Sequence, residues 1–247
     1  MPAKRTRVVS RDGQNVAHSE RLLRADILSG AIPAGSVMSQ AALGERFGIG
    51  RTPLREALRM LESEGLIVSA PNRRVQIAGL SNTDAEELYV MRIALETVAV
   101  TLTVPTLKSA DFAELDGYIA QMEYFMEARD AVGLREPHRA FHFHLTAAAG
   151  ARGQTEIAAL FDHAERYRMA YGAANDQDWD VRSTEHRAIR DAAAAGDPEL
   201  TARRLAEHYA HTARLIFAGL DPAYPPSRLR ATLALTAPGS EIALRGP

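Results

Sequence analysis

The apolar residues of this chain recur at helical spacing nearly everywhere, and strand-like runs occur only at 66–68 and 75–77. These two runs flank a turn rich in proline and asparagine, and they predict a hairpin. Glycines end three helical segments before the hairpin, at about 16–28, 40–47 and 52–64. Three short helices followed by a hairpin predict a winged helix-turn-helix.

After residue 80 the pattern changes to longer helical segments without a strand signal. The expected helices are 83–103, 109–131, 134–149, 154–173, 183–195 and 198–218. Six such helices predict an antiparallel all-α bundle. The fold class is therefore mainly α. The expected parts are a disordered basic arm at 1–14, the winged domain at 15–80, the bundle at 81–220 and a Pro-rich, poorly ordered tail at 221–247.

Composition narrows the functional classes. The chain has no cysteine, which excludes disulfides, thiolate metal sites and cysteine nucleophiles. We find no run of about 18 apolar residues and expect no membrane span. The basic N-terminus lacks the apolar core of a secretion signal. We therefore expect a cytoplasmic protein.

Charge is divided unevenly along the chain. Residues 1–80 carry 12 lysines and arginines against 7 aspartates and glutamates, whereas residues 81–247 carry 17 against 24. A basic small half joined to an acidic larger half is typical of a polyanion-binding module attached to another domain. Charge alone leaves chance variation between domains as an equal alternative.

The third helical segment carries the residue types that read DNA. Arg51 and Arg55 are four apart and share a face with Thr52 at the start of the helix, opposite a leucine stripe. A helix N-terminus favours phosphate, and arginines there can contact guanine edges. Arg73 and Arg74 at the hairpin tip could reach the minor groove or the backbone. Ordinary surface arginines on a solvated helix are the alternative.

Seven of the eight histidines lie beyond residue 137. His138 and His142 are four apart on one expected helix, and His186 and His208 lie on two others. This arrangement suits a divalent metal inside a bundle, although imidazole accepts zinc, nickel, copper or iron alike. A chance cluster on a polar face remains the alternative from spacing alone.

Residues 31–80 resemble the DNA-binding domain of the GntR family of bacterial transcription regulators. The matching residues are 32–35, Leu43, 47–49, the run RTPLREAL at 51–58, Leu61, 64–66 and 71–73. The resemblance implies that Arg51, Thr52 and Arg55 contact operator DNA. Gly50 departs from the usual serine and removes a hydroxyl that could cap the helix, and Arg74 replaces a common wing glycine.

Residues 83–218 resemble the FCD ligand-binding domain of the FadR branch of that family. The matches are MRIALE at 91–96, Phe141-His142, Leu145, Glu185-His186, Ile189, Gly196-Asp197, Leu205 and His208. The resemblance implies metal binding by His142, His186 and His208. His138 stands where the family has an acid, so the expected site has four histidines, or three if His138 turns away from the metal. Zinc is the first expectation for the metal and nickel the second.

The same resemblance implies a small carboxylate effector held with the help of the metal. Arg92 matches the pocket arginine of the family, and its forked guanidinium suits a carboxylate. Its alternative role is an ion pair with Glu96, four residues on. Tyr167 and Arg168 are further expected to line the cavity.

These observations together predict a homodimeric DNA-binding transcription regulator and not an enzyme. We expect a repressor whose operator binding is modulated by a small carboxylate in a metal-containing pocket. A regulator that responds directly to metal is the first alternative. A metal-dependent hydrolase with Glu185 as general base is a second. In a third, the histidines fill the cavity without a metal.

Overall fold

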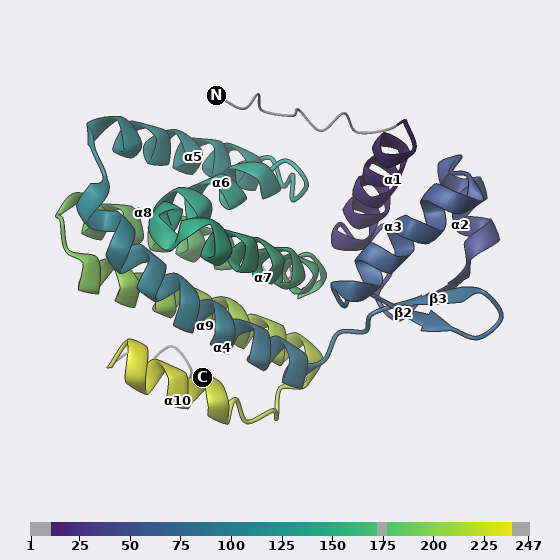
Figure 1. Ribbon diagram of the computed structural model, residues 1–247. Coiled ribbons are helices and arrows are strands. Elements are labelled where there is room, and N and C mark those ends of the chain that lie inside the picture. The colour runs from purple at the N-terminus through teal and green to yellow at the C-terminus, as the bar shows by residue number, and fades with distance from the viewer. Residues whose placement is uncertain (1–10, 172–176, 239–247) are drawn as a thin grey trace, which may run out of the picture. The chain divides into compact units, whose positions relative to one another are not determined.

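Figure 1 shows the computed structural model, which describes residues 11–171 and 177–238. The chain divides into two compact units, Met1–Leu80 and Ser81–Pro247, and each is described by itself. The first unit contains a small sheet among helices, and the second is helical wherever regular structure is described. This confirms the predicted fold class of a winged helix-turn-helix followed by an all-α bundle.

The first unit has helices α1 (Arg11–Leu28), α2 (Gln40–Phe47) and α3 (Arg51–Ser63), and strands β1 (Val37–Ser39), β2 (Ile67–Ala70) and β3 (Arg74–Ile77). The antiparallel strands lie in the order β1-β3-β2. Strand β1 was not predicted, because three residues are too short to show a pattern of alternation. Helix α1 begins at Arg11, so the expected disordered arm is wrong for residues 11–14. Residues 1–10 lie outside the described part of the chain.

Local sequence signals set the ends of α2 and α3. The Ser39 hydroxyl accepts from the Ala42 backbone N–H and caps α2, and Gly48 ends that helix with a positive φ of 64°. Gly50 precedes α3 and offers no side-chain cap. The predicted stripe on α3 is buried in the core of the unit. Its members are Leu54, Leu58 and Leu61.

The second unit is built from seven helices in its described residues. They are α4 (Asn82–Thr103), α5 (Ser109–Glu127), α6 (Arg135–Leu145), α7 (Gly150–Tyr171), α8 (Gln177–Ala194), α9 (Pro198–Leu220) and α10 (Ser227–Thr236), with short 3-10 turns at Val104–Thr106 and Ala147–Ala149. Helix α4 packs on α7, α9 and α10, while α5 packs on α6 and α8 (Figure 1). Helices α6, α8 and α9 carry the buried histidines His138, His142, His186 and His208.

The tail beyond residue 220 is not the poorly ordered segment that its prolines suggested. Leu229 and Leu233 of α10 are fully buried and lie four residues apart, so they form one apolar contact face. The buried Glu86 carboxylate accepts hydrogen bonds from the backbone N–H groups of Arg228 (2.8 Å) and Leu229 (3.1 Å). This carboxylate satisfies the N-terminus of α10 from another helix. Residues 239–247 of the expected tail lie outside the described part of the chain.

One helix, α4, bears on the expectation that the chain has no membrane span. The segment Asn82–Thr106 is long and apolar enough to cross a bilayer by length and composition, the one such helix in the described residues. However, 56% of its most apolar window is buried inside the unit. It also carries the buried ion pair of Arg92 and Glu96. These features identify α4 as the core helix of the bundle.

Candidate functional site

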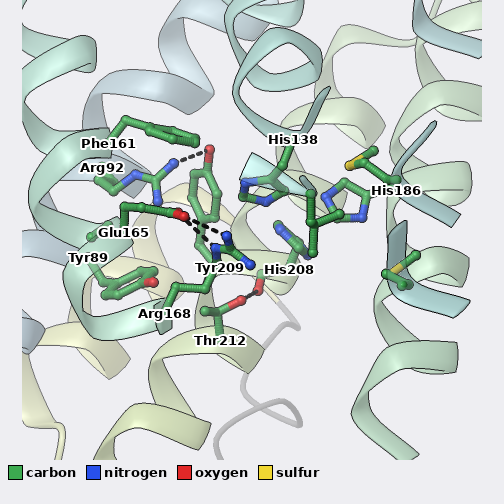
Figure 2. Close-up of a pocket in the computed structure, with 14 residues that line it drawn as sticks. Tyr89, Arg92, His138, Phe161, Glu165, Arg168, His186, His208, Tyr209 and Thr212 are labelled. Atoms are coloured by element: carbon green, nitrogen blue, oxygen red, sulfur yellow. Dashed lines mark hydrogen bonds and ion pairs between the residues drawn. The ribbon is translucent and has the colours of Figure 1, made fainter. Parts of the chain in front are cut away.

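The bundle brings together all four histidines that the sequence singled out. His138 and His142 lie on α6, His186 on α8 and His208 on α9. Figure 2 shows His138, His186 and His208 close to one another. All four are buried, and their potential ligand atoms lie within 4.8 Å of one another. Among the described residues this is the single group of His, Asp and Glu side chains with such geometry.

The cluster meets the chemical requirements of a transition-metal site. Bonds of about 2.0–2.1 Å to a tetrahedral zinc put ligand nitrogens roughly 3.3 Å apart. The Nε2 atoms of His138 and His142 are 3.2 Å apart, and the buried His138 Nδ1 has no hydrogen-bond partner. Burial, followed by nearby histidine and arginine charges, holds the pKa of both rings well below the usual range. The rings are therefore neutral and keep a lone pair for a cation.

Hydrogen bonds from outside the cluster set the orientation of His142. The Tyr209 hydroxyl donates its one proton to Glu96 (2.5 Å) and lies 3.1 Å from the His142 Nδ1. Since that proton is committed to Glu96, the His142 Nδ1–H must donate to the tyrosine oxygen. The Nε2 lone pair of His142 is then directed into the cluster.

Glu185 sets the orientation of the His208 ring. Its carboxylate accepts from the Nδ1 of His208 at 2.9 Å and from the Nδ1 of His211 at 2.7 Å. Burial favours the neutral acid, but the two histidine hydrogen bonds outweigh it and lower the Glu185 pKa to about 2. A carboxylate behind an imidazole fixes its tautomer and leaves Nε2 free for a metal. The sequence offered Glu185 as part of the FCD match and as a possible general base, but not as the partner of His208.

A small cavity adjoins the histidine cluster (Figure 2). Its volume is about 20 Å³, enough for a water molecule or an ion but not for an organic acid. The lining comes from the six helices α4 to α9 and includes Arg92, Met122, Met126, Glu165, Arg168, Thr212 and three of the four histidines. Binding of a larger ligand therefore requires side chains to move.

Both pocket arginines are already paired with carboxylates of their own helices. Arg92 donates from Nε to Glu96 (2.7 Å) and from Nη2 to the Tyr209 hydroxyl (2.8 Å). Arg168 donates two hydrogen bonds to the Glu165 carboxylate, from Nε at 2.8 Å and from Nη2 at 2.5 Å. The ion pair between Arg92 and Glu96 that the sequence offered as an alternative role is thus present, and it is buried.

Tyr167 is not part of this pocket, so the expectation for it is wrong. Its hydroxyl contacts the Ser81 backbone and the Asp84 carboxylate at the start of α4. Arg168, the next residue on α7, lines the cavity, whereas Tyr167 is not among the lining residues. Spacing could not reveal Glu185 and Tyr209, because their partners are 23 and 67 residues away.

The first unit collects most of its predicted DNA-binding residues on one concave surface. Arg51, Thr52 and Arg55 at the start of α3 line it together with Arg73 of the hairpin turn. All four side chains are exposed. Arg74 is also exposed, but it lies on β3 and is not among the residues that line the concavity.

A tight turn brings the hairpin to this surface. Asn72 and Arg73 both have positive φ angles, 61° and 56°, which reverse the chain between β2 and β3. The Arg73 carbonyl accepts from the Gln40 backbone N–H at 3.0 Å. The start of α2, the start of α3 and the wing thus form one basic hollow.

Comparison with protein families covers both units. Residues 16–77 match the family described as bacterial regulatory proteins, gntR family, and residues 87–211, more than half of the chain, match the FCD domain. The chain belongs to the GntR family. It is therefore a DNA-binding transcriptional regulator with an FCD domain, and the regulators it resembles are not named as enzymes.

Relatives and solved structures agree with this assignment. The regulator BphR of Paraburkholderia xenovorans and a probable D-xylose utilization operon repressor of Paenarthrobacter nicotinovorans are each 29% identical. Each match spans 75% of this chain and 78% or 81% of the relative. A 31% match to the regulator YdhC of Bacillus subtilis spans only 45% of that relative. The structure of E. coli McbR/YncC, 23% identical, shares the fold with a TM-score of 0.75 over 83% of this chain and 98% of that one.

Proposed function

We propose that this GntR-family regulator holds a divalent transition metal at His138, His142, His186 and His208, and that a small carboxylate bound beside the metal alters its affinity for operator DNA. Zinc is the preferred metal and nickel the second choice. The observation that carries the proposal is a buried cluster of neutral imidazoles whose ligand atoms lie within 4.8 Å of one another.

Residues around the histidine cluster would orient the metal ligands and meet the incoming carboxylate. Glu185 and Tyr209 orient His208 and His142 through their Nδ1 atoms. A divalent cation bound by neutral rings keeps its full charge, and this charge attracts an anion. An entering carboxylate has to compete with Glu96 for Arg92 or with Glu165 for Arg168. This exchange would change helix packing around the cavity and so couple ligand binding to conformation.

The winged unit reads the operator. We propose that Arg51, Thr52 and Arg55 enter the major groove, while Arg73 and Arg74 contact the minor groove or the backbone. Two copies of the chain bind a two-fold related operator in the cytoplasm and repress transcription until the acid binds. The shared basic hollow of α3 and the wing supports this arrangement.

The test starts with metal analysis of untagged protein. We expect about one divalent ion per chain, lost in the double variant His142→Ala, His186→Ala. A thermal-shift screen then compares small mono-, di- and hydroxycarboxylates with and without zinc or nickel. A ligand at 100 times its Kd stabilises the folded state by about 2.7 kcal/mol. Full metal content in the double variant would refute the ligand assignment. A thermal stability that no acid changes would refute the proposal of a carboxylate effector.

A regulator that senses the metal itself is the second candidate. The small cavity favours it, because a volume of about 20 Å³ accepts an ion without rearrangement. In that case operator affinity follows metal concentration in the absence of any organic acid. The hydrolase alternative is disfavoured, because both oxygens of Glu185 accept histidine hydrogen bonds and its pKa is too low for a general base.

A further inference from the structure

A surface groove lies where α4, α9 and the end of α10 meet, and it is distinct from the cavity beside the histidines. Its volume is about 460 Å³, and it shares no lining residue with that cavity. Helix α4 contributes Val98 and two threonines, α9 contributes Glu199, Ala202 and Arg203, and the chain after α10 contributes Pro238. A groove of this size is in the range of pockets that bind a partner.

The α4 side of the groove continues as an exposed apolar strip. Val98 is 57% exposed, and Leu102, one turn further along the same face of the helix, is 55% exposed. No residue of 11–171 or 177–238 covers these two side chains. A surface helix normally directs its apolar residues to the core, so a strip of this kind indicates a surface that meets a partner.

Two charged side chains of the groove indicate the chemistry of that partner. Glu199 and Arg203 are exposed and lie one turn apart on α9. They form no ion pair or hydrogen bond with another residue in the described part of the chain. By contrast, the neighbouring Arg204 pairs with Glu207. A partner that carries apolar side chains together with one acid and one base would match the groove.

The direction of α10 brings the chain to this groove. The first turn of α10 donates two backbone hydrogen bonds to Glu86, near the start of α4. Pro238, which follows α10, lies beside Val98 further along α4. The two helices therefore run in the same direction. A chain that keeps this course beyond Pro238 follows α4 toward its end at Thr103.

Helix α9 runs along α4 in the opposite direction. The Tyr209 hydroxyl donates to Glu96. Arg203 comes earlier in α9 and lines the groove with Thr101, which comes later in α4. Glu199 comes earlier still in α9. A segment that follows α4 from the end of α10 would therefore meet Arg203 first and Glu199 second.

The sequence that follows Pro238 matches this order of charges. Residues 239–247 read GSEIALRGP, so an acid comes first, two large apolar residues follow, and then comes a base. Glu241 is three residues beyond Pro238 and can lie within about 10 Å of it. Because Pro238 and Arg203 line the same groove, the acid can reach this arginine.

We propose that residues 239–247 bind in the groove of their own chain. Glu241 then pairs with Arg203. Arg245 pairs with Glu199, and the two large apolar residues between them cover the apolar strip. Neither the metal, the effector nor the operator takes part, so this contact can be tested apart from the proposed function.

The first experiment uses the absence of cysteine in the chain. Mild oxidation of a variant with Val98→Cys and Ile242→Cys should link the two thiols within one chain, as seen by a non-reducing gel and by mass spectrometry of the peptides. Val132→Cys with Ile242→Cys is the matched control and should stay unlinked, because Val132 is 70% exposed in the loop before α6 and does not line the groove. Absence of the Val98 link, or a link that joins two chains, would overturn the proposal.

The second experiment measures how fast the thiol of Val98→Cys reacts with a maleimide. Deletion of residues 239–247 should raise the rate about tenfold or more, because a covered thiol reacts only in the fraction of molecules whose cover is released. Unchanged far-UV circular dichroism in the deletion variant excludes unfolding as the cause. If the deletion leaves the rate unchanged, residues 239–247 do not cover Val98 and the proposal is wrong.

The third experiment tests the charges in the full chain. Arg203→Glu should raise the same reaction rate, and adding Glu241→Arg should lower it again, because the ion pair is then restored with its signs exchanged. Arg204→Glu is the control, since it reverses a neighbouring charge that pairs with Glu207 and does not line the groove. A rate that Arg203→Glu leaves unchanged, or that Arg204→Glu raises equally, would contradict the proposed pairing.

Discussion

The substitution Glu185→Gln should weaken metal binding without unfolding the bundle. Glutamine has the size of glutamate, but its amide accepts through only one oxygen and presents an N–H group at the other position. One of the two histidine contacts is therefore lost or reversed. The carboxylate charge that polarises the His208 ring is also removed.

The expected size follows from the Glu185 pKa. Burial raises this pKa, and the hydrogen bonds from His208 and His211 nevertheless lower it to about 2. Two histidines share that interaction, so loss of the His208 contact removes only part of it. Loss of an outer partner of a histidine ligand typically weakens metal binding 10–100-fold, so we expect the lower end of that range.

The assay is competition for zinc against a chelator of known affinity, with thermal unfolding of the metal-free protein measured in parallel. Glu123→Gln is the control, because Glu123 also joins α8 through Ser183 and Arg187 but does not contact the cluster. A zinc affinity of Glu185→Gln within twofold of the wild type would show that His208 is oriented by other means. An equal loss in Glu123→Gln would attribute the effect to helix packing.

Three further outcomes are expected. Arg55→Ala should weaken specific operator binding by about 1–3 kcal/mol in a mobility-shift titration while leaving thermal stability unchanged. Tyr209→Phe should destabilise the metal-free protein by about 1–3 kcal/mol in denaturant unfolding, because it leaves the buried Arg92 and Glu96 without a shared partner. Leu229→Ala should cost about 2–5 kcal/mol by the same measurement if α10 belongs to the folded unit, whereas a frayed tail would give no change.

Much of the helical framework could be predicted because its signals are local. Ser39 and Gly48 delimit α2, and the three leucines of α3 identify its buried face, so these two helices fall within one residue of expectation. The histidine set was also accessible, since an interval of four residues fixes a shared face on a helix. Its assembly from three helices rested on the family resemblance and not on spacing.

The remainder depends on tertiary contacts that a linear pattern does not encode. The prolines suggested a poorly ordered tail. However, Leu229 and Leu233 lie at helical spacing, and their burial stabilises α10 where it packs on α4. Likewise, the sequence offered Arg92 both as a carboxylate ligand and as a partner of Glu96, and spacing alone did not decide between the two roles. Burial of both residues turns a weak surface pair into a fixed part of the pocket.

Helix α4 connects the separate features of this regulator. Its inner face carries Arg92 into the pocket, paired with the buried Glu96, and on its outer face Met91, Val98 and Leu102 are exposed. Its first turn follows directly after the winged unit, which ends at Leu80. A ligand that draws Arg92 away from Glu96 would change the packing of the inner face. Because an α-helix moves as a rigid rod, the first turn would move with the inner face, so α4 is the element that would transmit ligand binding toward the DNA-binding unit.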